Sequence, residues 1–216
     1  MVISSGIGTD NVEILLTELH ILANYDLSTM QPAKRKSLPI IRIGTSGALH
    51  ADVPLDSLLV SDYAFGLDAL MQFYQLKQPS QYIDYAEELM DDCELELLPY
   101  CARADDDLKN LFAKEMQVGN TITTPGFYAP QGREIVLPIR PSNLIGKLRN
   151  FSFEGGTITN FEMETAAYYA LGSALGHQMI STNAIMANRI SNKFSTNPSR
   201  TMQKLISTVI SKIALL

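Results

Sequence analysis

Hydrophobic positions along the first third of the chain follow first a strand-like, then a helix-like, then again a strand-like pattern. Residues 2–5 are typical of a short buried strand, and a turn with Gly6 and Gly8 follows. Asp10 is the expected N-cap of a helix, and Pro39 leads into a second apolar strand, IIRIG. The helical spacing is carried by Val12, Leu15, Leu16, Leu19 and Leu22. A strand, a helix and a strand in this order predict a parallel sheet covered by helices.

The rest of the chain continues this alternation of strands and helices. Strands are predicted at 58–60, 118–124, 157–161 and 178–186, and helices at 108–116, 144–151, 163–175 and from Pro198 onward. Gly176 stands where a helix C-cap glycine belongs, and Asn197 is the expected N-cap of the last helix. We therefore predict one α/β domain over residues 1–216. It is a three-layer fold whose central mixed, largely parallel, twisted sheet is flanked by helices.

Composition indicates a folded protein outside the membrane. Hydrophobic residues make up 46% of the chain and charged residues 19%. No apolar run approaches the roughly 20 residues of a membrane span. The first residues lack the basic and apolar regions of a signal peptide. With only two cysteines, the chain is no disulfide scaffold, and we expect a cytoplasmic protein.

Charge and histidine spacing exclude two further classes of site. The three histidines are scattered and have no zinc-like partners, so neither a metal site nor a metal cofactor is predicted. The net charge is -6 and no basic stripe appears, which argues against a nucleic-acid partner. Acidic residues crowd the region 84–107, which we interpret as a solvated face.

The stretch IRIGTSGA, residues 41–48, is the first candidate for chemistry. A strand here ends in a loop with two glycines and two hydroxyls, and Arg42 lies just before Gly44 and Thr45. Exposed backbone N–H groups and short hydroxyls suit an anion. An arginine within an apolar strand needs an anionic partner. That partner is either a bound anion or a nearby carboxylate, and the spacing alone leaves both interpretations open.

The stretch NFEMETAA, residues 160–167, is the second candidate. Glu162 and Glu164 flank Met163 where a predicted strand meets a predicted helix, the end at which open α/β sheets bind ligands. Carboxylates at a helix N-terminus also favour the helix dipole, which by itself would explain one of them. Two of them leave room for binding the hydroxyls of a sugar.

The stretch FYAPQGR, residues 127–133, is the third candidate. Its proline and glycine exclude a smooth helix or strand. Gln131 and Arg133 place two long polar side chains two positions apart, near Phe127. On composition alone, solvated loop residues are the favoured interpretation.

Together these stretches resemble the nucleoside phosphorylase superfamily, and most closely the uridine phosphorylases. IRIGTSGA resembles the family's phosphate loop, FYAPQGR its pyrimidine-recognition loop, and NFEMETAA its ribose-binding junction. MANR, residues 186–189, resembles the strand end beside the base. The four stretches stand in the family's order along the chain, although residues 67–117 match poorly.

The resemblance implies phosphorolysis of a pyrimidine nucleoside, in which uridine and phosphate give uracil and ribose 1-phosphate. Inorganic phosphate is then a co-substrate and no cofactor is needed. The implied residues are Arg42, Gly44 and Thr45 for phosphate; Phe127, Gln131 and Arg133 for the base; Met163 and Glu164 for ribose; and Glu162 and Arg189 as supports behind them. The family also builds its site at a dimer interface, which implies a homodimer or a higher homo-oligomer.

Two alternatives remain beside uridine phosphorolysis. Purine-cleaving relatives usually carry an aspartate where Ala187 and Asn188 stand, which weakens a purine phosphorylase or nucleosidase interpretation without excluding it. The other alternative is a paralogue that binds a nucleoside and cleaves it weakly or not at all. Family chains normally begin some tens of residues earlier, with a first core strand and phosphate-binding arginines. From this we expect poor phosphorolysis by the 216-residue chain alone.

Overall fold

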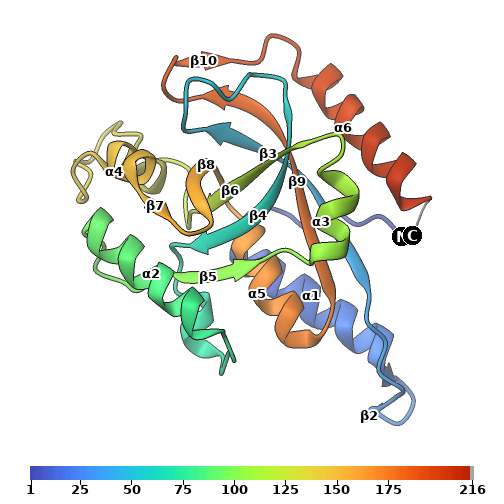
Figure 1. Ribbon diagram of the computed structural model, residues 1–216. Helices are drawn as coiled ribbons and strands as arrows, with labels where there is room; N and C mark the ends of the chain where they lie inside the picture. Colours follow the sequence, from blue (N-terminus) through green and yellow to red (C-terminus); the bar gives the residue numbers. More distant parts are fainter. Residues whose placement is uncertain (215–216) are drawn as a thin grey trace.

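A mixed sheet forms the centre of the molecule (Figure 1). The structure, a computed structural model, describes residues 1–214. The strand order is β10 (Lys193–Phe194), β9 (Gln178–Asn188), β3 (Pro39–Ala48), β8 (Gly156–Glu162), β6 (Gln117–Thr123), β4 (Leu58–Gly66) and β5 (Tyr100–Arg103), with β7 (Ser152–Phe153) beside β8. A small separate hairpin of β1 (Tyr25–Asp26) and β2 (Gln31–Pro32) projects from the body (Figure 1).

The sheet closes on itself. β3 pairs with β9, β4 with β6, and β6 with β8, all in parallel, whereas β3 and β8 are antiparallel. β4 pairs in addition with β9, antiparallel, through residues 58–60. The strands β9, β3, β8, β6 and β4 therefore form a ring, and β9 occupies the place between β3 and β4.

Helices cover the sheet in two groups, each with its own hydrophobic core. The larger core lies under α1 (Thr9–Asn24), α3 (Asp106–Phe112), α5 (Thr165–Leu175) and α6 (Pro198–Ile213). The smaller core lies under α2 (Ser80–Cys93) and α4 (Leu144–Asn150). Two short 3-10 turns complete the secondary structure, η1 (Leu70–Phe73) and η2 (Ala129–Gln131). This arrangement confirms the predicted fold class, a central mixed sheet flanked by helices.

Local signals explain several element boundaries. The side chain of Asn197 accepts a hydrogen bond from the backbone N–H of Arg200, so the predicted N-cap of the last helix is confirmed. Gly176 has φ 77°, a left-handed conformation that suits glycine, and it ends α5 as predicted.

Two predictions near the N-terminus are wrong. Residues 2–5 form no strand, because no strand of the described chain lies alongside them to supply hydrogen bonds, and the side chain of Val2 is fully exposed. The N-cap of α1 is Gly8, with φ 95°, and not Asp10, which lies within the first helical turn.

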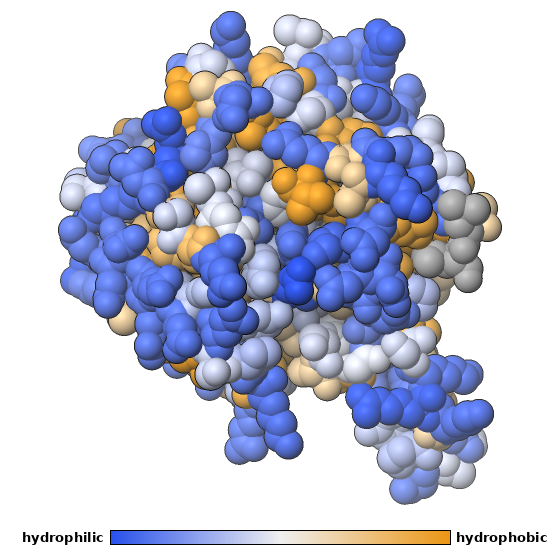
Figure 2. Space-filling model, viewed as in Figure 1, coloured by the Kyte–Doolittle hydropathy of each residue, from blue (hydrophilic) through white to orange (hydrophobic). Residues whose placement is uncertain are grey.

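Two elements in the acidic region were not predicted from the sequence. α2 and β5 both lie between residues 80 and 103. The acidic side chains of α2 point outward, as expected of a solvated face, while Tyr85, Ala86, Leu89 and Cys93 are buried beneath them. On the face shown in Figure 2, hydrophilic residues predominate and apolar residues form small separate patches. Within residues 1–214, no helix combines the length and the apolar character that crossing a bilayer requires.

Candidate functional site

A cavity of about 540 Å³ brings together the three sequence stretches singled out above. Nine of the ten predicted site residues line it: Arg42, Gly44, Thr45, Phe127, Gln131, Arg133, Glu162, Met163 and Glu164. They come from β3, from the loop around η2, and from the junction between β8 and α5. The tenth, Arg189, lies behind the cavity and approaches the carbonyl oxygen of Gly132 at 3.4 Å. This is a position from which it can orient the loop that carries Gln131 and Arg133.

Arg42 is the centre of a buried ion-pair cluster at one end of the cavity. Its Nη2 lies 2.9 Å from Oε2 of Glu162 and 2.5 Å from Oε2 of Glu164, and the Arg42 side chain is only 8% exposed. Burial opposes the charged form of Arg42, but the two carboxylates outweigh it and raise the pKa of the guanidinium. Of the two partners left open by the sequence, the structure therefore shows the carboxylates, and a bound anion would have to share Arg42 with them.

Glu162 is saturated with hydrogen-bond donors. Besides Arg42, it accepts hydrogen bonds from the hydroxyl of Thr123 at 2.7 Å and from the backbone N–H groups of Glu164 and Thr165 at 3.0–3.1 Å. Glu162 thereby ties β6, β8 and β3 to the first turn of α5. It supports the site from behind and leaves little capacity for a ligand.

Glu164 faces the cavity more directly, and both of its oxygens have partners. Oε2 binds Arg42, and Oε1 accepts the backbone N–H of Gly8 at 2.8 Å. The segment Ser5–Ile7 lines the cavity next to this contact. A ligand hydroxyl that binds Glu164 would therefore meet the N-terminal segment as a neighbour.

Gly44 has a steric reason to lack a side chain. A Cβ atom built at this position collides with the guanidinium of Arg42. The arginine lies flat over the backbone of β3 because glycine leaves that space open.

The other end of the cavity carries the polar pair predicted to bind a base. Gln131 is 4% exposed, and its Nε2 donates to the hydroxyl of Thr124 at 3.0 Å. Arg133 donates to Oε1 of Gln131 and to the carbonyl oxygen of Phe127, and it lies 3.9 Å from the centre of the Phe127 ring. These contacts fix both side chains on one irregular loop.

Arg133 and Arg189 differ from Arg42 in having no carboxylate within ion-pair distance among residues 1–214. Burial and the positive charge of Arg189 lower the pKa of Arg133, and burial lowers that of Arg189. Both effects mean that a negative charge placed here would be stabilised. The free positive charge of the cavity thus lies at the Gln131 end.

Several residues that line the cavity were not among the predicted site residues. One wall is apolar and contains Phe161, Met186, Phe194 and Met202. The hydroxyl of Ser46 is buried without a hydrogen-bond partner in the described chain. Ser46 and Met186 belong to stretches already singled out, IRIGTSGA and MANR, but a hydrophobic residue such as Phe194 gives by itself no sign that it faces a cavity. The loop predicted within IRIGTSGA is wrong, because β3 continues through Thr45 and Ser46 to Ala48, where it stays paired with β9.

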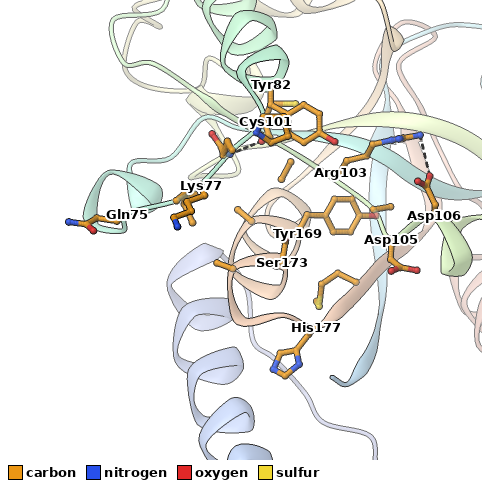
Figure 3. A pocket seen from close by; sticks show the side chains of 18 residues that line it. Gln75, Lys77, Tyr82, Cys101, Arg103, Asp105, Asp106, Tyr169, Ser173 and His177 are labelled. Carbon is orange, nitrogen blue, oxygen red and sulfur yellow. Dashed lines mark hydrogen bonds and ion pairs between the residues drawn. The ribbon is translucent and has the colours of Figure 1, made fainter. Parts of the chain in front are cut away.

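A second cavity, of about 580 Å³, lies between α5, β5 and the segment Gln75–Pro79 (Figure 3). Several of its charged groups already have protein partners: Arg103 pairs with Asp62 and Asp106, and Asp105 caps α3. None of the predicted site residues lines it. Nowhere in residues 1–214 do three or more His, Cys, Asp or Glu side chains gather in a way that could hold a metal ion.

Comparisons with known proteins agree with the fold. The sequence pattern of the phosphorylase superfamily matches residues 1–213. A uridine phosphorylase of Thermococcus kodakarensis is 26% identical over 197 residues, which cover 89% of this chain and 59% of that protein. The chain thus spans about three fifths of the length of this curated relative.

Solved structures show the same architecture. A Trypanosoma brucei nucleoside phosphorylase, described as showing uridine phosphorylase activity, superimposes with a TM-score of 0.88 at 23% identity, over 99% of this chain and 79% of that one. The apo form of uridine phosphorylase from Schistosoma mansoni gives a TM-score of 0.62 at 25% identity, over 95% of this chain and 68% of that one. Since the superfamily pattern extends over nearly every residue, this chain belongs to the phosphorylase superfamily.

Proposed function

We propose that the protein catalyses phosphorolysis of a pyrimidine nucleoside, with uridine and inorganic phosphate as substrates and without a further cofactor. The observation that carries this proposal is the division of charge within one cavity. A carboxylate cluster around Arg42 lies at one end, and the arginines near Gln131 lie without carboxylates at the other. A nucleoside needs this polarity, because its sugar presents hydroxyls and its base leaves as an anion.

The base end matches the edge of uracil. The amide of Gln131 can donate to a carbonyl oxygen and accept from the ring N3–H, and Arg133 can donate to the remaining carbonyl oxygen. In the structure Arg133 donates a hydrogen bond to Gln131, so uracil would replace a contact that already exists. Phe127, about half exposed, lies beside them and can pack against the ring.

The sugar end matches a ribose with phosphate beneath it. Glu164 would accept hydrogen bonds from the ribose hydroxyls together with the backbone of Met163, while Arg42, Gly44 and Thr45 would hold phosphate. In the reaction a phosphate oxygen forms the new bond to C1′, and the C1′–N1 bond breaks with its electron pair moving to the base. The charge developing on the base is stabilised by the donors of Gln131 and Arg133, an electrostatic effect of preorganised groups.

A second candidate function is nucleoside binding with little cleavage, and the Arg42 cluster supports it. One arginine between two carboxylates leaves the cluster with a net charge of about -1, which disfavours a phosphate dianion. Phosphate binding would then need positive charge from another chain, and we infer a homodimer or higher homo-oligomer as the active unit.

The test is to mix the purified chain with uridine, with and without phosphate, and to follow uracil and ribose 1-phosphate by chromatography. Phosphate-dependent formation of both products supports the enzyme. Uridine binding without products supports the second candidate. Cleavage that yields free ribose in the absence of phosphate would contradict phosphorolysis, and light scattering on the same sample tests the oligomeric state.

A further inference from the structure

The inner edge of Arg42 is held by a neutral residue that none of the proposed roles uses. Nη1 of Arg42 donates to Oδ1 of Asn183 at 2.9 Å and to the hydroxyl of Ser181 at 3.2 Å. Both partners lie on β9, the parallel neighbour of β3, and both are fully buried. The guanidinium therefore has carboxylates at one terminal nitrogen and neutral acceptors at the other.

The orientation of the Asn183 amide is fixed by a line of hydrogen bonds behind it. Nδ2 of Asn183 donates to the hydroxyl of Ser61 at 3.2 Å, and that hydroxyl lies 2.7 Å from the hydroxyl of Thr121. Thr121 in turn donates to Oδ1 of Asn160 at 3.0 Å. The line crosses β9, β4, β6 and β8, and all four side chains are 0% exposed. It exists because ring closure brings β4 next to β9.

Turning the amide of Asn183 over would set its NH₂ group against the guanidinium, donor against donor. The carbonyl oxygen must therefore face Arg42. Two features of asparagine matter here: it supplies an acceptor that a hydrophobic residue lacks, and it supplies this acceptor without a charge. A carboxylate in its place would be a third negative group around a single arginine, in a cavity that has to admit an anion.

We propose that Asn183 is a positioning residue for Arg42. It holds the Nη1 edge so that the guanidinium stays flat over Gly44 and faces the cavity, and it does so without adding negative charge. The consequence for phosphate rests on the proposed function, in which Arg42 contacts phosphate. The consequence for Arg42 itself does not depend on any activity.

The first measurement is the NMR spectrum of the arginine side chains in the full chain labelled with nitrogen-15, with Arg42→Lys used to assign the Arg42 signals. A guanidinium held at both terminal nitrogens should give separate, slowly exchanging Nη signals. We expect Asn183→Ala to merge or broaden them. Asn120→Ala is the matched control, because Asn120 is a buried asparagine on β6 whose partners are Tyr63, Gly155 and Thr157. Unchanged Arg42 signals in Asn183→Ala would overturn the proposal.

The second measurement is the binding of inorganic phosphate by calorimetry, together with KM for phosphate as a function of pH. We expect Asn183→Ala to weaken phosphate binding about tenfold, while KM for uridine changes less than about twofold. Asn183→Asp should weaken phosphate binding at least tenfold at neutral pH. The binding should recover as the pH falls, because the protonated side chain of the introduced aspartate is again neutral. Asn120→Asp should show no such pH dependence.

The two measurements separate the possible failures. If the Arg42 signals collapse in Asn183→Ala but phosphate binding does not change, the positioning role stands and the assignment of Arg42 to phosphate is wrong. If Asn183→Ala does not fold, Asn183→Asp still decides, since a phosphate KM with the wild-type pH profile would refute a role for the neutral acceptor.

Discussion

Replacing Glu162 with glutamine should destabilise the fold far more than its small size suggests. Both carboxylate oxygens of Glu162 accept hydrogen bonds: Oε1 from Thr123 and Thr165, and Oε2 from Arg42, Glu164 and Thr165. Whichever way the amide of Glu162→Gln turns, its NH₂ group faces a donor instead of an acceptor. The substitution also removes one charge from a buried ion pair whose Glu162 side chain is 2% exposed.

Breaking one side of a buried ion pair typically costs about 3–5 kcal/mol. Glu164 still faces Arg42 in this variant, so we expect a loss near the lower limit, about 3 kcal/mol in the free energy of unfolding. For a chain of this size that corresponds to a fall in Tm of roughly 6–12 °C. The assay is urea denaturation followed by circular dichroism, with the m-value fitted for each variant.

Glu96→Gln is the matched control for this substitution. Glu96 also pairs with an arginine, Arg140, at 2.5 Å, but the two side chains are 68% and 80% exposed. An exposed pair contributes about 0–1 kcal/mol, so the control should stay close to wild type. Suppose instead that the free energy of unfolding of Glu162→Gln lies within about 1 kcal/mol of the wild-type value, with an unchanged m-value. The hydrogen bonds and the ion pair of Glu162 would then not be a source of stability.

Three further predictions concern the base site, a buried histidine and the cysteines. Arg133→Ala should lower kcat/KM for uridine roughly tenfold to a hundredfold, since a lost charge-assisted hydrogen bond costs about 1.5–3 kcal/mol; wild-type kinetics in a folded variant would remove the pyrimidine assignment. Burial, together with His20 and Arg35, lowers the pKa of His177, so the unfolded chain binds this proton more readily. The contribution of neutral His177 to the free energy of unfolding is therefore complete above the unfolded pKa of about 6.5 and is lost as the pH falls. His177→Gln should make the free energy of unfolding less dependent on pH between neutral and mildly acidic conditions. If the free energy of unfolding of His177→Gln fell just as steeply with pH as that of wild type, the pH dependence would belong to other groups. Burial raises the pKa of Cys93 to about 12 and also raises that of Cys101, so a thiol reagent should label neither in the native chain and both in denaturant. Rapid labelling of the native chain would contradict their burial.

The sequence was most informative where local chemistry decides the structure. The apolar strands β3 and β9 and the Asn197–Pro198 start of α6 follow from runs of hydrophobic residues and from cap chemistry within a few positions. α2 was missed although Tyr85, Ala86, Leu89 and Cys93 fall at helical spacing, because the dense acidic residues between them concealed that pattern. The prediction of a strand at residues 2–5 was wrong although its apolar pattern was clear, because a strand also needs a neighbouring strand, and the local sequence does not reveal one.

The candidate site likewise has features that the local sequence predicts and features that depend on contacts between distant residues. The stretches around Arg42, Gln131 and Glu164 could be singled out from residue types and spacing, and they line one cavity. That Arg42 is held by Glu162, Glu164 and Asn183 could not be predicted, because these partners lie 120 or more positions away along the chain. Their roles toward phosphate, ribose and base remain predictions for the measurements above.

The place of β9 between β3 and β4 has a consequence for how the protein acquires its shape during synthesis. Arg42 and its partner Ser181 are 139 positions apart, so the ribosome has made most of the chain before the two strands can meet. Until then β3 and β4 each present an unpaired edge, which is a template for association with other chains. Contacts of such long range also make folding slow. We expect nascent chains that end before residue 178 to be aggregation-prone, and β9 to act as the strand whose arrival both protects these edges and assembles the cavity.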